Sequence, residues 1–305
     1  MKLAPIVIFS YKRLNLLKKL INSLKKNKLS QKSILYIFSD GPKSLKDGRQ
    51  VIKVRKYIKK ITGFKKKIYI FRKRNLGLAH NIIDGNNKIF NKFDRAIILE
   101  DDLEVSNKFI EFMNLALIKY KNKKKVWHIS SWNYKLNIKN YKNDAYFWRC
   151  MNCWGWASWA NRWKNFNNNI NDYLKWNKQQ IKKFNLDNHI NFWSQIKRNK
   201  EKKINTWAIF WYATIFKNNG LCLNPINSLS KNNGYDKFAE HWSPNLPLTI
   251  TNVNINDDSY QWKNNLPSLI REDKFIIEKI KNVTKKKIFN VLFNKLFRKN
   301  KFFIL

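Results

Sequence analysis

The sequence predicts an α/β protein built around a parallel sheet, and two observations support this class. Over the first 105 residues, short apolar runs alternate four times with segments of helical period, which is the pattern of consecutive βαβ units. The last apolar run, residues 96–99, leads directly into three carboxylates, Glu100, Asp101 and Asp102. Because three unpaired charges are too costly to bury, they must lie where the strand leaves the core, at the edge where α/β proteins bind ligands.

The first half of the chain is expected to alternate strictly between strands and helices. Each expected strand is a short run rich in Ile, Leu, Phe or Val, and each helix carries apolar residues on one face. The segment after the second strand, Ser39-Asp40-Gly41-Pro42, has turn chemistry with a carboxylate at a strand's carboxyl end. Strands are expected at residues 5–9, 34–38, 67–71 and 96–99, and helices at residues 16–24, 51–61 and 78–90.

Past residue 105 the pattern changes and aromatic residues become frequent. Trp156, Trp159 and Trp163 fall at three- and four-residue spacing, so they are expected on one helix face, most simply as core. Trp207 and Trp211 are expected to share the face of another helix. A helix is also expected at residues 106–119, a strand at 126–130 and an edge strand at 220–225, with irregular chain from 246.

The last segment, residues 270–305, has the pattern of a basic amphipathic helical tail. Ile276, Ile280 and Val283 make one apolar stripe, and a second stripe follows in residues 288–296 among many lysines. Such a helix can lie in an anionic membrane interface. It can equally pack on the protein body with a solvated basic face, and the sequence leaves both interpretations open.

The composition indicates a folded, strongly basic protein. Of its 305 residues 44% are apolar, and the formal charge of +42 implies an anionic partner such as nucleic acid, a lipid surface or a phosphorylated substrate. Lys and Asn are heavily used throughout, as expected from AT-rich coding DNA, so the charge alone favours no single partner. The N-terminus lacks signal-peptide features and no run of about 18 apolar residues occurs, so we expect a cytoplasmic protein, peripheral at most on the inner membrane face.

The three cysteines are expected to be buried free thiols in a reducing compartment. Cys150 and Cys153 form a C-x-x-C pair, but no second pair or neighbouring His completes a zinc site around them or Cys222. Disulfides are rare in such compartments. We therefore expect no zinc or redox function here.

The acidic triplet is the strongest candidate for a functional site. Hard oxygen ligands gathered at a strand end suit Mg²⁺ or Mn²⁺, and such an ion suits a phosphate group. An alternative is that the acidic residues belong to a loop that caps the next helix, which would begin at Ser106.

Several segments together resemble the ordered motifs of GT-A glycosyltransferases. These are residues 5–13 (PIVIFSYKR), 39–41 (SDG), 74–81 (RNLGLAHN) and 99–105 (LEDDLEV). The EDDLEV stretch and Trp154-Gly155-Trp156 resemble the branch that contains the N-acetylglucosaminyltransferase I family and its bacterial relatives. The resemblance runs from about residue 5 to 242. It implies a GT-A fold, a Rossmann-like mixed sheet with flanking helices, over residues 1–245. Residues 1–105 would be the nucleotide-binding half, 106–245 the acceptor half and 246–305 a C-terminal extension.

The resemblance also implies roles for individual residues on the donor side. Asp102 matches the direct metal ligand at the diphosphate, and Glu100 and Asp101 match its neighbours that contact ribose, sugar or metal-bound water. Asp40 matches the acid that binds the nucleoside base, and His241 matches a late metal- or phosphate-contacting His. The positions lining the nucleotide pocket are matched by Ser10, Arg13, Arg74, Asn75, Gly77 and Asn81.

On the acceptor side, the resemblance points to Trp154, Gly155, Trp156 and Trp207. An inverting transferase needs a carboxylate that deprotonates the acceptor hydroxyl. Relatives of the eukaryotic enzyme carry an Asp just after the Trp that matches Trp207, whereas this chain has Ala208. Asp236 and Glu240 are the nearest alternatives, and Asp187 is a weaker one.

The leading hypothesis is therefore a metal-dependent hexosyl- or N-acetylhexosaminyltransferase. It would use Mn²⁺ or Mg²⁺ and a nucleotide sugar, expected to be a UDP-sugar, to glycosylate a hydroxyl of a bacterial surface glycan such as lipooligosaccharide or capsule, with inversion. The acceptor would be a glycan or a lipid-linked one, and an anionic membrane surface is a further partner to consider. A nucleic-acid-binding protein explains the charge but not a buried strand ending in three acids. A catalytically silent nucleotide-binding subunit also stays open.

Overall fold

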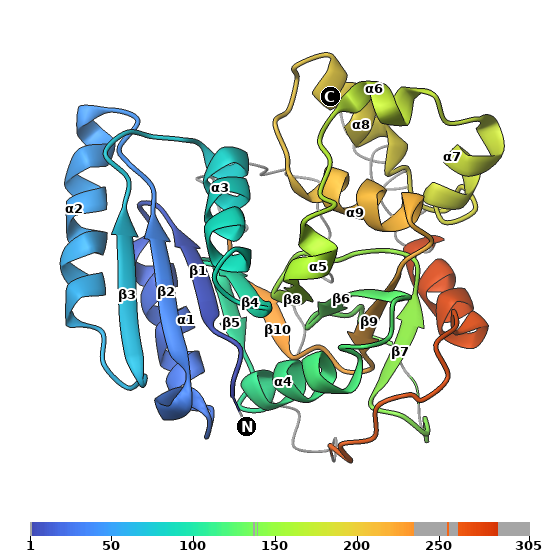
Figure 1. The fold of residues 1–305 in the computed structure, drawn as a ribbon, viewed down its shortest axis with the longest axis horizontal. Helices are drawn as coiled ribbons and strands as arrows, with labels where there is room; N and C mark the ends of the chain where they lie inside the picture. Colours follow the sequence, from blue (N-terminus) through green and yellow to red (C-terminus); the bar gives the residue numbers. More distant parts are fainter. Residues whose placement is uncertain (1, 137, 139, 235–254, 256–261, 286–305) are drawn as a thin grey trace, which may run out of the picture.

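The computed structural model describes residues 2–136, 138, 140–234, 255 and 262–285. Within them, an eight-stranded mixed sheet in the order β3-β2-β1-β4-β8-β6-β9-β7 runs through the molecule with helices on both faces (Figure 1). The predicted α/β class is thus confirmed. The strands are β1 Ile6–Ser10, β2 Ile34–Ser39, β3 Lys66–Phe71, β4 Arg95–Glu100, β6 Val126–Ser130, β7 Ala145–Trp148, β8 Trp156–Trp159 and β9 Leu221–Pro225. The helices are α1 Leu14–Lys25, α2 Leu45–Lys60, α3 Leu78–Phe90, α4 Phe109–Lys119, α5 Ala160–Trp163, α6 Ile170–Leu174, α7 Lys178–Phe184, α8 Trp193–Lys200 and α9 Ala208–Lys217.

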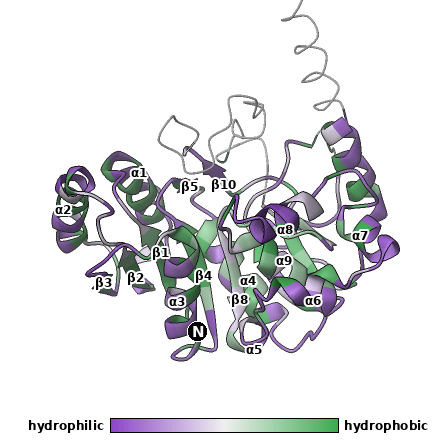
Figure 2. Ribbon diagram, turned by 90° about the horizontal axis from the view of Figure 1, so that it is seen from above, coloured by the Kyte–Doolittle hydropathy of each residue, from purple (hydrophilic) through white to green (hydrophobic). Residues whose placement is uncertain are grey.

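The N-terminal half is a parallel sheet with β1 between β2 and β4. Residues of β1 pair in register with both neighbours, and the strand is buried along its whole length. Val7 and Phe9 pack toward α3, while Ile6 and Ile8 pack toward α1 and α4. Because both faces are covered, the strand reads as a continuous apolar run rather than an alternating one. Hydrophobic residues accordingly gather along the strands, and the outer helix surfaces are hydrophilic (Figure 2).

The second half joins the same sheet through an antiparallel strand. β8 lies between β4 and β6 and is antiparallel to both. The prediction of one helix for Trp156, Trp159 and Trp163 is wrong for the first two, which lie in β8, while Trp163 lies in α5. Their burial in the core is as expected. The expected edge strand is also inside the sheet, because β9 pairs with both β6 and β7.

A two-stranded sheet extends the edge where β4 ends. In the described chain it consists of β5 Leu103–Val105 and the antiparallel β10 Ser230–Asn232. Glu100 therefore ends β4, and Asp101 and Asp102 form the turn between β4 and β5. The strand β10, which is far along the chain, pairs with β5 next to this turn. This pairing ties the acid turn to the end of the described second half.

The C-terminal segment packs on the body at least over its described part. Ile276, Ile277 and Ile280 of the helix at residues 274–285 are buried in the main core. Upstream of this helix, Arg149 and Glu272 form an ion pair of 2.7 Å. The first apolar stripe of the tail thus faces protein, while the second stripe lies outside the described residues. No helix in the described part of the chain is both long and apolar enough to cross a bilayer.

Candidate active site

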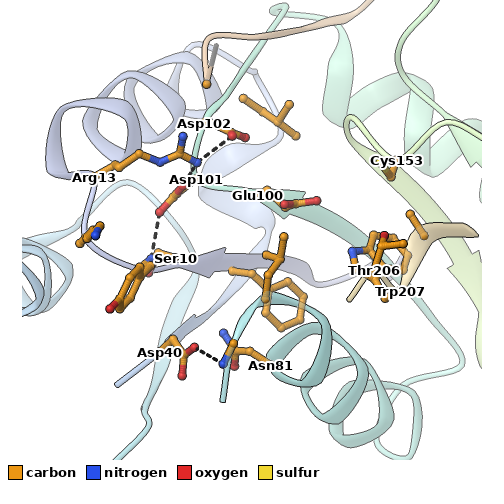
Figure 3. A pocket seen from close by; sticks show the side chains of 18 of the residues that line it. Ser10, Arg13, Asp40, Asn81, Glu100, Asp101, Asp102, Cys153, Thr206 and Trp207 are labelled. Carbon is orange, nitrogen blue, oxygen red and sulfur yellow. Dashed lines mark hydrogen bonds and ion pairs between the residues drawn. The ribbon is translucent and has the colours of Figure 1, made fainter. Parts of the chain in front are cut away.

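A cavity of about 590 Å³ lies at the carboxyl ends of β1, β2 and β4. One wall combines the loop after β1, the loop after β2 and the acid turn after β4. The opposite wall comes from the segment before β8 and from the start of α9 (Figure 3). The lining residues include Ser10, Arg13, Asp40, Asn75, Gly77, Asn81, Glu100, Asp101, Asp102, Cys153, Trp154, Thr206, Trp207, Ala208, Asn232 and Gly234.

Arg13 and the acid turn form the charged centre of the cavity. Arg13 Nη2 lies 2.7 Å from Asp102 Oδ2 and 3.2 Å from Asp101 Oδ1. The backbone N–H of Tyr11 donates to the other oxygen of Asp101 at 2.9 Å. Two residues of the loop after β1 thus hold the carboxylates that follow β4, because these two parallel strands are neighbours and end at the same edge.

The two carboxylates differ in burial. Asp101 is only 5% exposed, and burial raises its pKa to about 6; Arg13 acts in the opposite direction, and the charge of Asp102 adds to the rise. The Asp102 side chain is 14% exposed and opens on the cavity. Asp101 therefore serves as an internal anchor, and Asp102 is the acid better placed to meet a ligand.

Gly234 fixes the other side of Asp102. A Cβ atom on Gly234 would lie 2.2 Å from Asp102 Oδ2, so no side chain fits there. The backbone N–H of Asn233 donates to the Asp102 carbonyl at 2.8 Å. The Asn-Asn-Gly run at 232–234 predicts a loop, but nothing in the sequence indicates that this loop reaches Asp102.

Asp40 organises the turn that precedes α3. Among the described residues, its carboxylate accepts from the backbone N–H groups of Gly41, Leu76 and Gly77 and from the Asn75 side chain, at 2.8, 2.9, 3.0 and 3.2 Å. These donors occupy both oxygens. The observed contacts thus give Asp40 a positioning role, beside the base-binding role that the resemblance implies.

Other expected donor-side residues divide between the cavity and the surface. Asn81 lines the cavity and accepts from Arg72 Nε at 3.2 Å. Ser10 also lines it, and its buried hydroxyl has no hydrogen-bond partner within the described chain. Arg74, by contrast, is exposed and does not line the cavity, because its turn is anchored by Asp40 through the backbone of 76–77. The prediction that its side chain lines the pocket is not what the structure shows.

The opposite wall is aromatic. Trp154 and Trp207 line the cavity, and Trp154 meets the edge of Trp132 at 4.8 Å between ring centroids. Trp156 does not line it: this residue is 1% exposed and stacks behind Trp207 at 5.4 Å and on His128 at 5.3 Å. The structure therefore corrects the prediction that Trp156 contacts the acceptor: its ring supports Trp207 from the core.

Gly155 is also buried away from the cavity. It has a φ of +82°, and a Cβ atom there would lie 2.4 Å from Ser131 Oγ. The Ser131 hydroxyl contacts the carbonyls of Trp154 and Gly155 at 3.0 and 2.9 Å. Gly155 is thus a tight turn that sets the position of Trp154 rather than an acceptor contact.

Comparison with known proteins now identifies the chain. A family model described as the GNT-I family matches residues 1–177, more than half of the 305 residues. The chain belongs to the GNT-I family. This is a glycosyltransferase family, and with the mixed sheet described above the fold is GT-A.

Similar solved structures share only part of this GNT-I family chain. S. aureus TarS matches with 12% identity and a TM-score of 0.32, over 47% of this chain and 24% of that one. The mannosyltransferase PcManGT from Pyrobaculum calidifontis, in complex with GDP-Man and Mn²⁺, matches with 10% identity and a TM-score of 0.32, over 43% of this chain and 36% of that one. The chain thus spans well under half the length of either protein. No curated protein matches it.

The positions expected to supply a catalytic base or a late metal ligand in this GNT-I family member lie in different places. Ala208 lies in the cavity wall, at the start of α9, so the position where relatives carry an acid has no carboxylate here. Asp187 lies elsewhere, where it pairs with Arg149 and Lys281 at 3.4 Å each. Asp236, Glu240 and His241 lie outside the described residues. Figure 3 shows Glu100 between the acid turn and the Thr206–Trp207 wall.

Among the residues that the structure describes, the acid turn suits a divalent ion that a substrate helps to hold. Within the described ranges, no group of three or more His, Cys, Asp or Glu side chains could form a metal cage. Mg²⁺, however, is commonly bound through one or two carboxylates and substrate phosphates. Asp102, an accessible hard ligand beside an open cavity, fits that second mode.

Proposed function

We propose that this GNT-I family protein is a metal-dependent glycosyltransferase that moves a sugar from a nucleotide sugar, a UDP-sugar, to a hydroxyl of an acceptor glycan. The observation that carries the proposal is the cavity that faces Asp102 and Arg13 with the Trp154–Trp207 wall. A phosphate-binding edge and an aromatic wall are what a donor diphosphate and sugar rings need on the two sides of one reaction centre.

Each lining group has a defined task in this proposal. Asp102, together with the donor diphosphate, would hold Mn²⁺ or Mg²⁺, and the bound ion supplies neutralisation of charge on the leaving nucleoside diphosphate. Asp40 orients the 75–77 turn at the nucleotide end of the cavity. Trp154 and Trp207 present apolar ring faces on which a sugar can stack.

The catalytic base belongs to the same proposal. Inverting transfer requires a carboxylate that removes the acceptor proton. Since Ala208 cannot do this, we assign the task to Asp236 or Glu240, which come soon after Gly234 in the sequence. Gly234 itself lies against Asp102.

For the acceptor we propose a bacterial surface glycan such as lipooligosaccharide or capsule, carried on lipid and glycosylated on the inner membrane face. The support is the net charge of +42, which favours phosphorylated or lipid-bound anionic partners. Transfer would add a hexose or an N-acetylhexosamine.

A thermal-shift panel tests the proposal: UDP, GDP, CMP and dTDP, each with and without Mn²⁺. A ligand that binds only the folded state stabilises it by about 2.7 kcal/mol at a hundred times its dissociation constant. Stabilisation by UDP only with Mn²⁺ is the expected result. If no nucleotide stabilises the protein with either metal condition, the proposal is wrong.

A second candidate, a catalytically silent nucleotide-binding subunit, is favoured by Ala208 at the cavity wall. It shares the UDP and Mn²⁺ response but predicts neither hydrolysis of UDP-sugars nor transfer to any acceptor. Release of UDP from a panel of UDP-sugars, measured with and without lipooligosaccharide, separates the two.

A further inference from the structure

Arg13 occupies the carboxylate that the proposed function gives to a metal ion. Its Nη2 atom is 2.7 Å from Asp102 Oδ2, the distance of a direct charge-assisted hydrogen bond. The same nitrogen lies 3.2 Å from Asp101 Oδ1, so one guanidinium bridges both acids. A positive charge of the chain itself thus offsets part of the negative charge of Asp101 and Asp102.

The position of Arg13 is imposed by the fold. Arg13 is the residue that caps the N-terminus of α1, directly after the loop that follows β1. The adjacent Tyr11 N–H holds Asp101 at 2.9 Å, which fixes the loop against the acid turn. On the far side of Asp102, Gly234 packs so closely that even a methyl group would collide with Oδ2. Asp102 Oδ2 therefore lies between Arg13 and Gly234.

A divalent ion on Asp102 would compete with Arg13 for the charge of this carboxylate. A Mg²⁺–oxygen contact is about 2.0–2.1 Å long, so an ion on Asp102 would lie next to the guanidinium and repel it. Close packing on the Gly234 side leaves the carboxylate little room to turn away. The repulsion therefore favours an exchange in which metal binding displaces Arg13 from Asp102.

A guanidinium displaced from Asp102 still has Asp101 beside it, and the donor diphosphate would supply a second anion. Arginine matches phosphate oxygens with two parallel hydrogen bonds, and Arg13 already lines the cavity. We infer that Arg13 is an internal cation that takes the place of the metal on Asp102 in the free protein and passes to the donor diphosphate when the metal binds. This inference rests on the proposed function and assigns Arg13 as the residue that makes metal binding depend on the nucleotide.

The direct test is metal binding without nucleotide. Mn²⁺ affinity is measured by electron paramagnetic resonance on wild type, Arg13→Gln and Lys12→Gln, with no UDP present. Lys12→Gln is the matched control, since it removes the same charge from the adjacent residue. The Lys12 side chain pairs with Asp47, at 2.7 Å, and not with the acid turn. Because Mn²⁺ no longer has to break a charged hydrogen bond, Arg13→Gln should bind it at least about tenfold more tightly than wild type. Lys12→Gln should gain much less.

A second variant covers a failure of Arg13→Gln to fold. Arg13→Lys keeps the charge but lacks the planar fork that bridges two carboxylates, so its Mn²⁺ affinity should also rise, by a smaller factor. Unchanged affinity in the folded Arg13 variants, or an equal gain in Lys12→Gln, would overturn the inference.

The outcome also separates this inference from the proposed function. If wild type shows Mn²⁺-dependent UDP binding while the Arg13 variants keep wild-type Mn²⁺ affinity, only the exchange of Arg13 is wrong. If wild type shows no metal-dependent nucleotide binding, the proposed function itself fails.

Discussion

Replacing Asp40 by Ala should destabilise the protein far more than loss of one surface acid. The substitution leaves the backbone N–H groups of Gly41, Leu76 and Gly77 without their acceptor, and each unsatisfied buried donor costs about 1–3 kcal/mol. Since water can reach the part-buried Leu76 and Gly77 donors, we use the lower end and expect a loss of about 3 kcal/mol in the free energy of unfolding.

Urea denaturation at constant m-value measures this loss. Asp94→Ala is the matched control, because that acid is 60% exposed and its pair with Lys121, 3.3 Å long, should contribute about 1 kcal/mol or less. Asp40→Asn retains one acceptor oxygen and should lose about half as much as Asp40→Ala. A loss below about 1 kcal/mol for Asp40→Ala would refute the positioning role. Full stability with lost UDP binding would instead assign Asp40 to the nucleoside base alone.

Three further predictions follow from the same structure. His128 is buried, which lowers its pKa to about 3, and its Nδ1 accepts from Trp211 Nε1 at 3.3 Å. Because the unfolded chain binds the proton near pH 6.5, stability should fall as pH decreases below that value, by about 2.7 kcal/mol at pH 4.5; urea titrations of wild type and His128→Asn would measure it. Asp102→Ala should abolish Mn²⁺-dependent UDP binding, measured by calorimetry, while circular dichroism stays unchanged. Gly155→Ala should cost about 2 kcal/mol or more, in urea, because its Cβ would meet Ser131 Oγ at a positive φ.

Each of these three has its own contrary outcome. Parallel pH profiles for wild type and His128→Asn would show that another group causes the acid sensitivity. Unaltered UDP affinity in Asp102→Ala would remove the metal assignment. For Gly155, the control is Gly48→Ala in α2, where the nearest atom to a new Cβ is 4.0 Å away. Alanine favours a helix more than glycine does, so this control should not destabilise the protein. If both alanines stabilise the protein, the collision at Gly155 is not real.

The strands and helices that sequence patterns predicted best are those whose signals are local. The helix expected at 78–90 has those bounds, and the buried strands of the parallel half were found from continuous apolar runs. α2 begins at Leu45 rather than 51, because Ser44 caps it by accepting from the Asp47 N–H at 3.2 Å, a local signal that was overlooked. The Trp156–Trp159 segment has a helical spacing of aromatics, but pairing with β4 and β6 makes it a strand, and that pairing is not local.

In the candidate site, too, some contacts could be predicted from local sequence signals and others depend on pairing between distant segments. Asp40, Asn75 and Asn81 meet the acidic triplet in one cavity because parallel strands end at one edge, which a sequence can indicate. The enclosure of Asp102 by Gly234 depends on β10 pairing with β5 across more than a hundred residues. Nothing in either segment alone encodes that contact.

The position of β8 has a mechanical consequence. Its backbone hydrogen bonds to β4 on one side and β6 on the other join the parallel N-terminal strands and the strands of the second half into one continuous sheet. A hinge motion between the two walls of the cavity would have to break backbone hydrogen bonds of this sheet in the buried core. The two walls therefore do not open and close as two hinged bodies. The sheet therefore sets the distance between the two walls, and adjustment to a substrate is left to the loops around the cavity.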